Sequence, residues 1–408
     1  MKMEIFILVV TVFYVALKCL IDMSQIVFIN NYKMTNDEIN KLELNANDYN
    51  EARDYNKSKL FLSLCKLVIE ALVIYTFIIS NGLLWMNDNI ALHNLFIPHE
   101  YILLIIFFTL LFAIKLPLSF YSTFYIESKY GFNSMTKKLF LRDSIITYIL
   151  TTIVIVCSFY IFEVIFYNFN QNWWLIFWLC FLIFNFLLII IYPNYIAPIF
   201  NKFDRISDKK LLENIDELTK KSRFEVDDIF VMDGSKRSKH SNAYFTGLFG
   251  KKRIVFFDTL LESLTYDEIK SVLAHEIGHY KMKHIQKSLV ISMIISFIYF
   301  YIFFQITQNF YLLSSYHLAT VNIAVLFIIL TPVLLFFINP FLSNLSRMNE
   351  YEADNFAKKY SNGQALKSSL LKLYKDNFSL VKSSNLYTFF YHTHPTVYER
   401  IINLNKKI

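Results

Sequence analysis

Long runs of apolar residues alternate with shorter polar segments along most of this chain. Seven runs are long enough to cross about 30 Å of hydrocarbon as helices. The first of them has no small-residue cleavage site, which favours a retained helix over a signal sequence. We therefore predict an α-helical polytopic membrane protein with seven spans, at residues 5–21, 60–84, 102–122, 144–167, 173–195, 288–309 and 318–341.

Two longer polar stretches divide this pattern. One covers residues 199–287, between the fifth and sixth spans, and the other covers residues 343–408, after the seventh. We therefore expect four regions in the chain. Spans one to five with their loops fill 1–198, the first polar segment fills 199–287, the last two spans fill 288–342, and a polar C-terminal segment fills 343–408.

The first polar segment contains three short runs with the composition of β-strands. They lie at Asp228–Met232, Ser241–Gly247 and Arg253–Asp258, and glycine or lysine clusters bound them. We expect a small sheet in a polar domain. An edge strand of such a sheet can bind an extended peptide, although the same runs could simply form the core of the domain.

The composition agrees with a membrane protein. Of 408 residues, 55% are hydrophobic and 18% are charged, and the mean hydropathy is +0.39. A soluble globular domain carries about a quarter charged residues. The net charge of +7 is spread through the polar segments without an arginine-rich patch. This distribution favours contact with a membrane surface and excludes a nucleic-acid partner.

The distribution of lysine and arginine predicts the orientation in the membrane. With seven spans, the connections 85–101, 168–172 and 310–317 lie on one side, and they contain no lysine or arginine. The other side receives the connections 22–59 and 123–143 and both polar segments, all of which contain lysine. The positive-inside rule makes this second side cytosolic. The N-terminus is then lumenal.

Several polar side chains fall inside the predicted spans. Each one alone is compatible with snorkelling to the interface or with a hydrogen bond between helices. As a set they favour a helix bundle with a polar interior or a water-filled cavity. They are Lys18, Glu70, Lys115, Glu163, Asn185 and Asn322.

The sequence LAHEIGHYKMKH at 273–284 carries candidate metal chemistry. The capping-box pattern of Thr265–Glu268 predicts a helix that starts near Tyr266. On this helix His275 and His279 project from one face, one turn apart, which suits tetrahedral zinc. Glu276 is close enough to act as general base toward a zinc-activated water. The alternative is an amphipathic helix that happens to carry two histidines.

The residues after the motif contain three lysines that mark a membrane interface. They are Lys281, Lys283 and Lys287, directly before the span at 288–309. We expect the zinc helix to run on through them into that span. Hydrolytic chemistry would then take place at the membrane boundary.

A third metal ligand is expected on a polar helix just after the last span, over Ser346–Asp354. Glu350 and Asp354 are four residues apart on this helix. One of them can bind the metal while the other orients a ligand histidine. Glu352 points elsewhere on the helix, and we interpret it as a solvated surface charge.

The sequence His394–Arg400 is a further candidate. An imidazole near the metal could donate to the oxyanion of a tetrahedral intermediate. The alternative is that His394 caps a helix beginning at Pro395, and the spacing alone favours this cap. We interpret His240, His284 and His392 as surface or interface residues.

At this point the sequence resembles a known family, the type I CAAX prenyl proteases. These are integral-membrane zinc metallopeptidases that include the yeast a-factor-processing and human prelamin-A-processing enzymes. The resemblance extends over most of the chain. It is carried by Glu127–Asn133, Tyr192–Phe200, Asp233–Phe245, Arg253–Leu261, the HEIGH helix, Asn349–Ala357, His394–Pro395 and Glu399–Arg400.

The resemblance implies a fold and a metal site. It implies seven helices that enclose a large water-filled chamber, with a cytosolic HExxH zinc metalloprotease domain that faces the interior near the cytosolic end. It implies one Zn²⁺ per chain, bound by His275, His279 and Glu350. It also implies that Glu276 is the general base.

Further roles follow from the same resemblance. Asp354, with Arg400 beside it, would support the metal ligands from behind. Asn242 and His394 would hold the substrate backbone or the developing oxyanion. The implied reaction removes the last three residues after a farnesylated or geranylgeranylated cysteine of a CAAX protein. The implied location is the endoplasmic reticulum membrane, continuous with the nuclear envelope, with membrane lipid around the chain.

Two other functions stay open from the sequence. One is a membrane quality-control metalloprotease, which needs only an apolar substrate. The other is a scaffold or channel without enzymatic activity, in which the site is vestigial. The chain is shorter than many eukaryotic members of the resembled family. Its end, Asn405–Ile408, misses the dilysine retrieval spacing by one position, which affects only the expected location.

Overall fold

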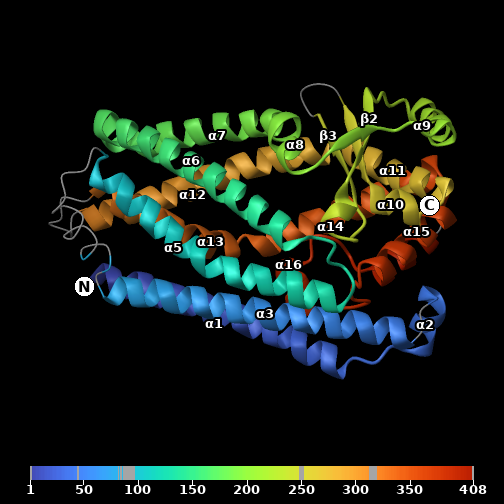
Figure 1. Ribbon diagram of the computed structural model, residues 1–408, viewed down its shortest axis with the longest axis horizontal. Coiled ribbons are helices and arrows are strands. Elements are labelled where there is room, and N and C mark those ends of the chain that lie inside the picture. Colours follow the sequence, from blue (N-terminus) through green and yellow to red (C-terminus); the bar gives the residue numbers. More distant parts are fainter. Residues whose placement is uncertain are drawn as a thin grey trace.

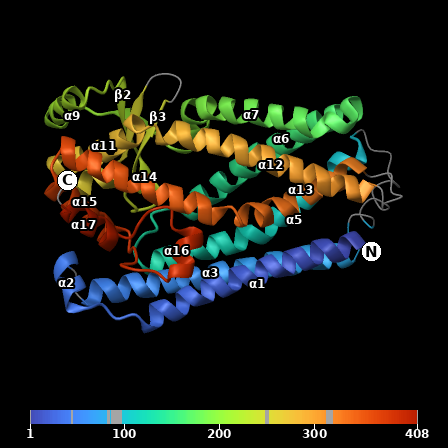
Figure 2. The same ribbon diagram turned by 180° about the vertical axis from the view of Figure 1, so that it is seen from behind.

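Long helices run side by side along the long axis of the molecule, and a small sheet with shorter helices lies at one end (Figure 1). The computed structural model describes residues 2–43, 46–80, 82, 85, 97–247, 252–311 and 319–406. The described chain begins at the end of the long axis opposite the sheet, and it finishes beside the sheet (Figure 2).

Each predicted apolar run falls mainly on one long helix. These helices are α1 (Lys2–Asn31), α3 (Ala46–Ile79), α5 (His99–Tyr121), α6 (Lys137–Phe169), α7 (Trp173–Ile191), α12 (His284–Tyr311) and α13 (Ala319–Phe336). By length and composition, five helical stretches of the described chain can cross a membrane, or six if one bent pair counts as a span. One stretch, Lys137–Phe200, contains both α6 and α7, which pack together around the short turn η2 (Asn170–Asn172).

The ends of several predicted runs differ from the helices. α1 continues ten residues past the predicted end at residue 21, and α3 begins fourteen residues before residue 60. The run 318–341 is not one straight helix, because α13 ends at Phe336 and α14 (Asn339–Tyr360) begins at an angle of 54° to it. Most of the predicted connections 85–101 and 310–317 lies outside the described residues, as do residues 81, 83, 84 and 318.

Apolar packing holds the long helices together away from the sheet. A buried cluster joins α5, α6, α7, α12 and α13 through rings such as Phe107, Phe162, Trp173 and Phe303. Aromatic rings supply this contact area with little loss of conformational entropy, because they have few rotatable bonds.

Three of the polar residues within these helices pair with other helices. Glu163 of α6 accepts hydrogen bonds from Tyr101 Oη at 2.6 Å and from Thr320 Oγ1 at 3.2 Å. Lys115 Nζ of α5 lies 3.7 Å from Glu70 Oε2 of α3. These contacts match the sequence interpretation as bonds between helices, which satisfy polar groups among apolar neighbours.

A mixed four-stranded sheet forms the polar end of the molecule. Its strands are β1 (Phe203–Arg205), β2 (Asp228–Met232), β3 (Ala243–Thr246) and β4 (Arg253–Phe257), in the order β1-β2-β4-β3. β2 and β4 are parallel, and the other neighbours are antiparallel. The three predicted strands are confirmed, and the short β1 is additional. β3 lies at one edge of the sheet.

Short helices complete this end of the molecule. They are α2 (Asn36–Leu42), α8 (Ala197–Phe200), α9 (Lys209–Ser222), α10 (Asp258–Ser263), α11 (Tyr266–Lys281), α15 (Gly363–Asp376), α16 (Asn385–Tyr391) and α17 (Val397–Asn405), with the π-helical segments η1 (Ser122–Glu127) and η3 (Tyr192–Ile196) and the 3₁₀ turn η4 (Gly234–Lys236).

α11 is the central helix of this end. Its apolar residues Leu273 and Ile277 are fully buried, in a core that includes Ile254 and Phe256 of β4 and Leu218 of α9. On its other sides α11 packs against α14 and α15. A helix that is covered on several sides keeps its side chains in fixed directions, as a rigid site requires.

α11 and α12 are separate helices, so the expectation of one continuous helix is wrong. α11 ends at Lys281 and α12 begins at His284. Lys283 between them has a left-handed backbone, with φ of 58°. A residue in this conformation does not continue a right-handed helix. The break changes where the side chains after it point.

Candidate metal centre

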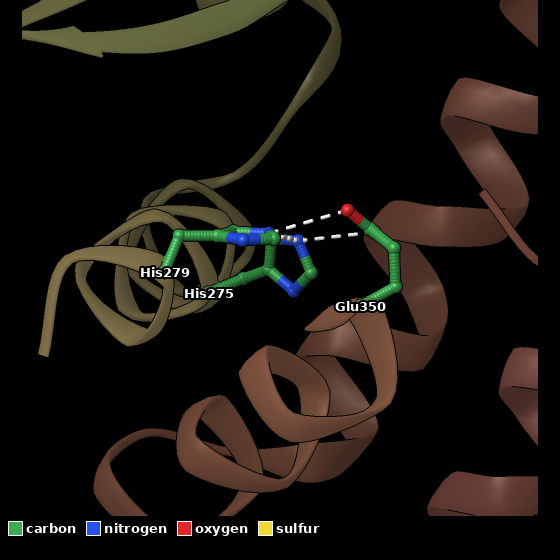
Figure 3. Close-up of side chains that lie close together, drawn as sticks. All are labelled: His275, His279 and Glu350. Carbon is green, nitrogen blue, oxygen red and sulfur yellow. Dashed lines mark hydrogen bonds and ion pairs between the residues drawn. The ribbon is translucent and has the colours of Figure 1, made fainter. Parts of the chain in front are cut away.

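Three side chains from two helices meet beside α11 (Figure 3). The Nε2 atoms of His275 and His279 are 3.1 Å apart. Glu350 of α14 places Oε2 3.4 Å from His275 Nε2 and Oε1 3.2 Å from His279 Nε2. The ligand atoms of these residues lie within 4.8 Å of one another and could hold a metal ion. The structure thus brings together the two predicted histidines and the predicted glutamate.

A close approach of α11 and α14 makes this meeting possible. Gly278 lies between the histidines on α11, and a Cβ atom there would be 3.0 Å from the Cα of Ala353 on α14. Both positions are filled by small residues, so the two backbones can come together. Glu350 lies one turn before Ala353 and therefore reaches the histidines.

The second nitrogen of His275 binds an aspartate. His275 Nδ1 lies 2.9 Å from Asp354 Oδ1, and Asp354 is fully buried. Arg400 of α17 donates through Nε to Asp354 Oδ2 at 2.8 Å, and its Nη1 lies 3.5 Å from Glu350 Oε2. The sequence left open which acid faces the histidines. In the structure Glu350 faces them, while Asp354 contacts His275 from behind.

Opposing effects act on the protonation of His275. Burial opposes its positive charge, but the hydrogen bonds to Asp354 and Glu350 outweigh burial and raise its pKa to about 9. A proton and a metal ion compete for the same Nε2 lone pair, so a metal that binds here must displace the proton. The pKa of Glu276, the next residue on α11, is raised, mainly because burial disfavours its charged form.

His394 lies at the open side of the cluster. Its Nδ1 is 3.0 Å from Glu350 Oε2, and 65% of its side chain is exposed. The interpretation of His394 as a helix cap is wrong, because α17 begins at Val397 and Thr396 is its N-cap. The Thr396 hydroxyl accepts a hydrogen bond from the backbone N–H of Glu399 at 3.4 Å.

A cavity of about 580 Å³ adjoins the cluster. Asn242, directly before β3, lines this cavity together with His394 and Arg400. Gln25 of α1 and Tyr391 of α16 also line it, so it extends between the sheet end and the long helices. An extended peptide in this cavity would have the predicted Asn242 and His394 on its walls.

Sequence reasoning gave His284 no part in this neighbourhood, because it was interpreted only as a surface or interface residue. Only 3% of His284 is exposed, and its Nδ1 lies 3.0 Å from Nδ1 of His279. Its Nε2 lies 3.0 Å from Glu352 Oε2. Glu352 is half-exposed, as expected, but it is paired. The spacing from His279 would have pointed to His284 only if the helix break had been foreseen.

The two other histidines that were left aside lie apart from the metal cluster. His240 stacks on Phe132, and its Nδ1 lies 2.9 Å from Asn377 Oδ1. His392 Nε2 lies 3.2 Å from Ser383 Oγ. These contacts connect loops and helices, in agreement with the interpretation as interface residues.

Comparison with known proteins identifies the family. The family description Peptidase family M48 matches residues 205–408, and CAAX prenyl protease N-terminal, five membrane helices, matches residues 28–202. A Dictyostelium discoideum protein named CAAX prenyl protease 1 homolog is 32% identical over 385 residues, which cover 90% of this chain and 89% of the relative. The chain belongs to the CAAX prenyl protease 1 family of M48 peptidases.

Other members of this family agree with the assignment. CAAX prenyl protease 1 of Saccharomyces cerevisiae is 36% identical over 72% of this chain and 69% of the relative. The human CAAX prenyl protease 1 homolog is 32% identical over 70% and 69%. The crystal structure of S. mikatae Ste24p superposes with a TM-score of 0.90, at 30% identity, over 99% of both chains. The resemblance stated from sequence is confirmed, and the chain is a multi-pass membrane metalloprotease.

Proposed function

We propose that this chain is a zinc-dependent endopeptidase that removes the C-terminal three residues from farnesylated or geranylgeranylated CAAX proteins. The observation that carries the proposal is the cluster of His275, His279 and Glu350, found in a member of this family at the junction of the sheet end and the long helices. The relatives' names supply the substrate class.

The distances within the cluster fit zinc. Ligand atoms about 2.0–2.1 Å from a tetrahedral zinc ion lie about 3.3 Å from one another. The two Nε2 atoms here are 3.1 Å apart, and each has a Glu350 oxygen nearby, Oε1 at 3.2 Å from His279 and Oε2 at 3.4 Å from His275. Two imidazoles and one carboxylate are also the donor set of a catalytic zinc site with a free fourth position. We infer one Zn²⁺ per chain, with Asp354 and Arg400 supporting the ligands.

The surrounding residues fit the hydrolysis of a peptide bond. A zinc ion held by His275, His279 and Glu350 would supply Lewis acidity toward water and the scissile carbonyl. Glu276 accepts the proton of the attacking water, and it then gives this proton to the leaving amine. Burial raises the pKa of Glu276, which strengthens its carboxylate as a proton acceptor. His394 and Asn242 hold the substrate backbone and donate to the developing oxyanion from the cavity wall.

The position of the site fits a substrate that is half lipid and half peptide. The metal ligands on α11 lie only a few residues before α12, which is long and apolar enough to cross a membrane. The adjoining cavity is lined mainly by polar and aromatic residues. We infer that the peptide part lies in this cavity while the prenyl chain stays among the long helices.

We propose seven membrane spans around a large water-filled chamber, formed by α1, α3, α5, α6, α7, α12 and α13. The family description of five membrane helices matches residues 28–202, a range that contains α3, α5, α6 and α7 and the last residues of α1, and it supports a multi-span N-terminal half. The four regions then follow the boundaries 1–198, 199–287, 288–342 and 343–408. Both polar segments are cytosolic and the N-terminus is lumenal. We propose the endoplasmic reticulum membrane, continuous with the nuclear envelope, as the location, because it agrees with the expected class of substrate.

A pair of peptides tests the substrate class. Purified full-length protein is incubated with a farnesylated CAAX peptide and with the same peptide unmodified, and released tripeptide is measured. We expect cleavage of the farnesylated peptide at a much higher rate. Equal cleavage of both would instead support a broad quality-control protease.

Metal analysis tests the enzyme class independently. We expect about one zinc per chain in the wild type and its loss in Glu350→Ala, since the site then keeps only two ligands. A wild-type protein without zinc would leave a scaffold or channel as the remaining interpretation.

A further inference from the structure

Behind His279 lies a chain of hydrogen-bonding groups that ends at the surface. His284 Nδ1 is 3.0 Å from His279 Nδ1, and His284 Nε2 is 3.0 Å from Glu352 Oε2. Only 3% of His284 is exposed, whereas 49% of the Glu352 side chain is exposed. Both nitrogens of a buried imidazole thus have a partner, so the ring orientation of His284 is fixed.

The helix break at Lys283 creates this contact. In a continuous helix His284 would project about 140° around the axis from His279, because they are five residues apart. The left-handed Lys283 turns the chain, and α12 begins at His284 with its side chain facing back toward α11. Since a non-glycine residue in this conformation costs on the order of 1 kcal/mol, the surrounding contacts must hold it there.

We propose that His284 and Glu352 are positioning residues for His279. The Nδ1–H of His279 donates to Nδ1 of His284, and the Nε2–H of His284 donates to Glu352. This pattern leaves the lone pair of His279 Nε2 directed at the metal position. It also fixes the ring plane of His279. The inference rests on the proposed metal site and adds two residues to it.

The two ligand histidines are then supported in matching ways. Asp354 accepts directly from Nδ1 of His275, at 2.9 Å. The backbone of α14 carries Asp354 and Glu352 two residues apart, so the two carboxylates leave the helix in different directions. One reaches His275 directly, and the other reaches His279 through His284. Partners of this kind typically contribute 10–100-fold to metal affinity.

Metal affinity of substituted full-length proteins tests the proposal. The dissociation constant of zinc is measured by chelator competition in detergent, and the absorption spectrum is recorded with Co²⁺ in place of zinc. We expect His284→Leu, which fills the space without an acceptor, to weaken zinc binding 10–100-fold and to change the Co²⁺ spectrum. His284→Asn retains an acceptor near the Nδ1 position and should recover part of the affinity.

Glu352 gives a second pair of variants on a half-exposed position, where folding is least at risk. We expect Glu352→Ala to weaken zinc binding and Glu352→Gln to recover part of it, because the amide oxygen can still accept from His284. Matched controls are His99→Asn at the start of α5 and Glu213→Gln on the exposed face of α9. Both should bind zinc as the wild type does.

The outcomes separate the two proposals. If the wild type binds no zinc, the proposed function fails and the inference fails with it. If the wild type binds zinc but His284→Leu and Glu352→Ala bind it equally well with unchanged Co²⁺ spectra, only the positioning role is wrong. If His284→Leu does not fold, the Glu352 pair decides. A purely structural role would lower the melting temperature of the metal-free variants without changing the Co²⁺ spectrum.

Discussion

His275 and His279 are equivalent in the sequence motif, but the protein surrounds them differently. His275 is buried, and a fully buried aspartate binds its second nitrogen. His279 is less buried, and a second imidazole contacts it. Glu350 completes the cluster from another helix. The different supports mean that substitutions behind the two candidate ligands should differ in severity.

Glu276 should be needed for turnover and not for metal binding. It lies next to His275 on α11 but is not among the three clustered ligands. We expect Glu276→Gln, which keeps the shape and removes the base, to lower kcat by about 10²–10⁴-fold, the range of general-base catalysis. Zinc content by mass spectrometry should stay at the wild-type level. Full activity of this variant would remove Glu276 from the mechanism.

The sequence was informative about residues whose signal is local. His275, Glu276 and His279 lie within one turn of helix, so helical periodicity alone relates them. The spacing limited the third ligand to Glu350 or Asp354, and the family resemblance implied Glu350. His284 could not be placed in this way, because its direction depends on the backbone of Lys283, and lysine carries no signal for a left-handed conformation.

At the scale of elements, the crossing of α11 and α14 decides the geometry of the site. These helices carry all three candidate ligands, and they approach closely at Gly278 and Ala353. Neither helix has the ligands alone. The distance between the two helix axes therefore sets the distance between Glu350 and the histidines.

Gly278→Ala should disturb this crossing. The added methyl group would lie 3.0 Å from Ala353 Cα and 3.2 Å from Ala353 O, which are backbone atoms that cannot rotate away. We expect a loss of about 1–3 kcal/mol in stability from overpacking, together with weaker zinc binding. The measurements are the melting temperature and the zinc dissociation constant.

Gly363→Ala is the matched control for this substitution. The atoms nearest to its methyl group would all belong to the Lys358 side chain, with Cγ at 3.3 Å, and this flexible side chain can move. We expect wild-type zinc binding and little change in melting temperature. If both substitutions lowered the melting temperature and weakened zinc binding equally, the close approach of the helices at Gly278 would not explain the effect.

The start of α11 is held by a buried carboxylate. Glu268 accepts hydrogen bonds from Ser368 and Lys372 of α15 and from the backbone N–H of Thr265, at 2.6–2.7 Å. Burial opposes its charge, but these bonds outweigh burial, and the pKa of Glu268 falls below its usual 4.5. The lowered pKa means that the ionised carboxylate stabilises the folded protein.

Glu268→Gln should therefore destabilise the protein in a pH-dependent manner. A depressed folded pKa contributes stability that is present above the unfolded value of 4.5 and is lost as the pH falls through the folded value. We expect a loss of about 2 kcal/mol at pH 7, with a gap to the wild type that narrows below pH 4.5. The melting temperatures of the wild type and the variant at pH 7 and below pH 4.5 measure this difference in stability. The exposed Glu217, which pairs with Lys270, is the control, and Glu217→Gln should change little.

Two elements could not be delimited from the pattern of apolar residues. The apolar run continues from α13 into the start of α14, so hydropathy does not reveal the 54° bend at Phe336–Asn339. β1 has only three residues, too few for a periodicity to appear. In contrast, α11 began at the predicted residue, because its capping box is a local signal.

At the scale of the whole molecule, the metal cluster lies toward the end that carries the sheet, and the described chain begins at the opposite end. The proposed seven spans would place these two ends on opposite sides of the membrane. The short turn between α6 and α7 lies far from the sheet in both views. Chemical labelling of single cysteines at the two ends can therefore test which end faces the cytosol.

Single cysteines should report the orientation in sealed microsomes. The native Cys19, Cys65, Cys157 and Cys180 are first replaced by serine. In that background we expect Lys359→Cys to react with a membrane-impermeant maleimide from outside the vesicles, which is the cytosolic face. Gln171→Cys, in the turn between α6 and α7, should react only after permeabilisation. The reverse pattern would place the metal site in the lumen.

The two residues between α11 and α12 connect the metal site mechanically to the surrounding lipid. α12 has 28 residues and is about 42 Å long, more than the thickness of the hydrocarbon layer, so it adapts by tilting. Its first residue, His284, touches His279. A change in tilt would therefore move a residue that contacts His279, a proposed metal ligand. Bilayer thickness would then enter the geometry of the proposed metal site.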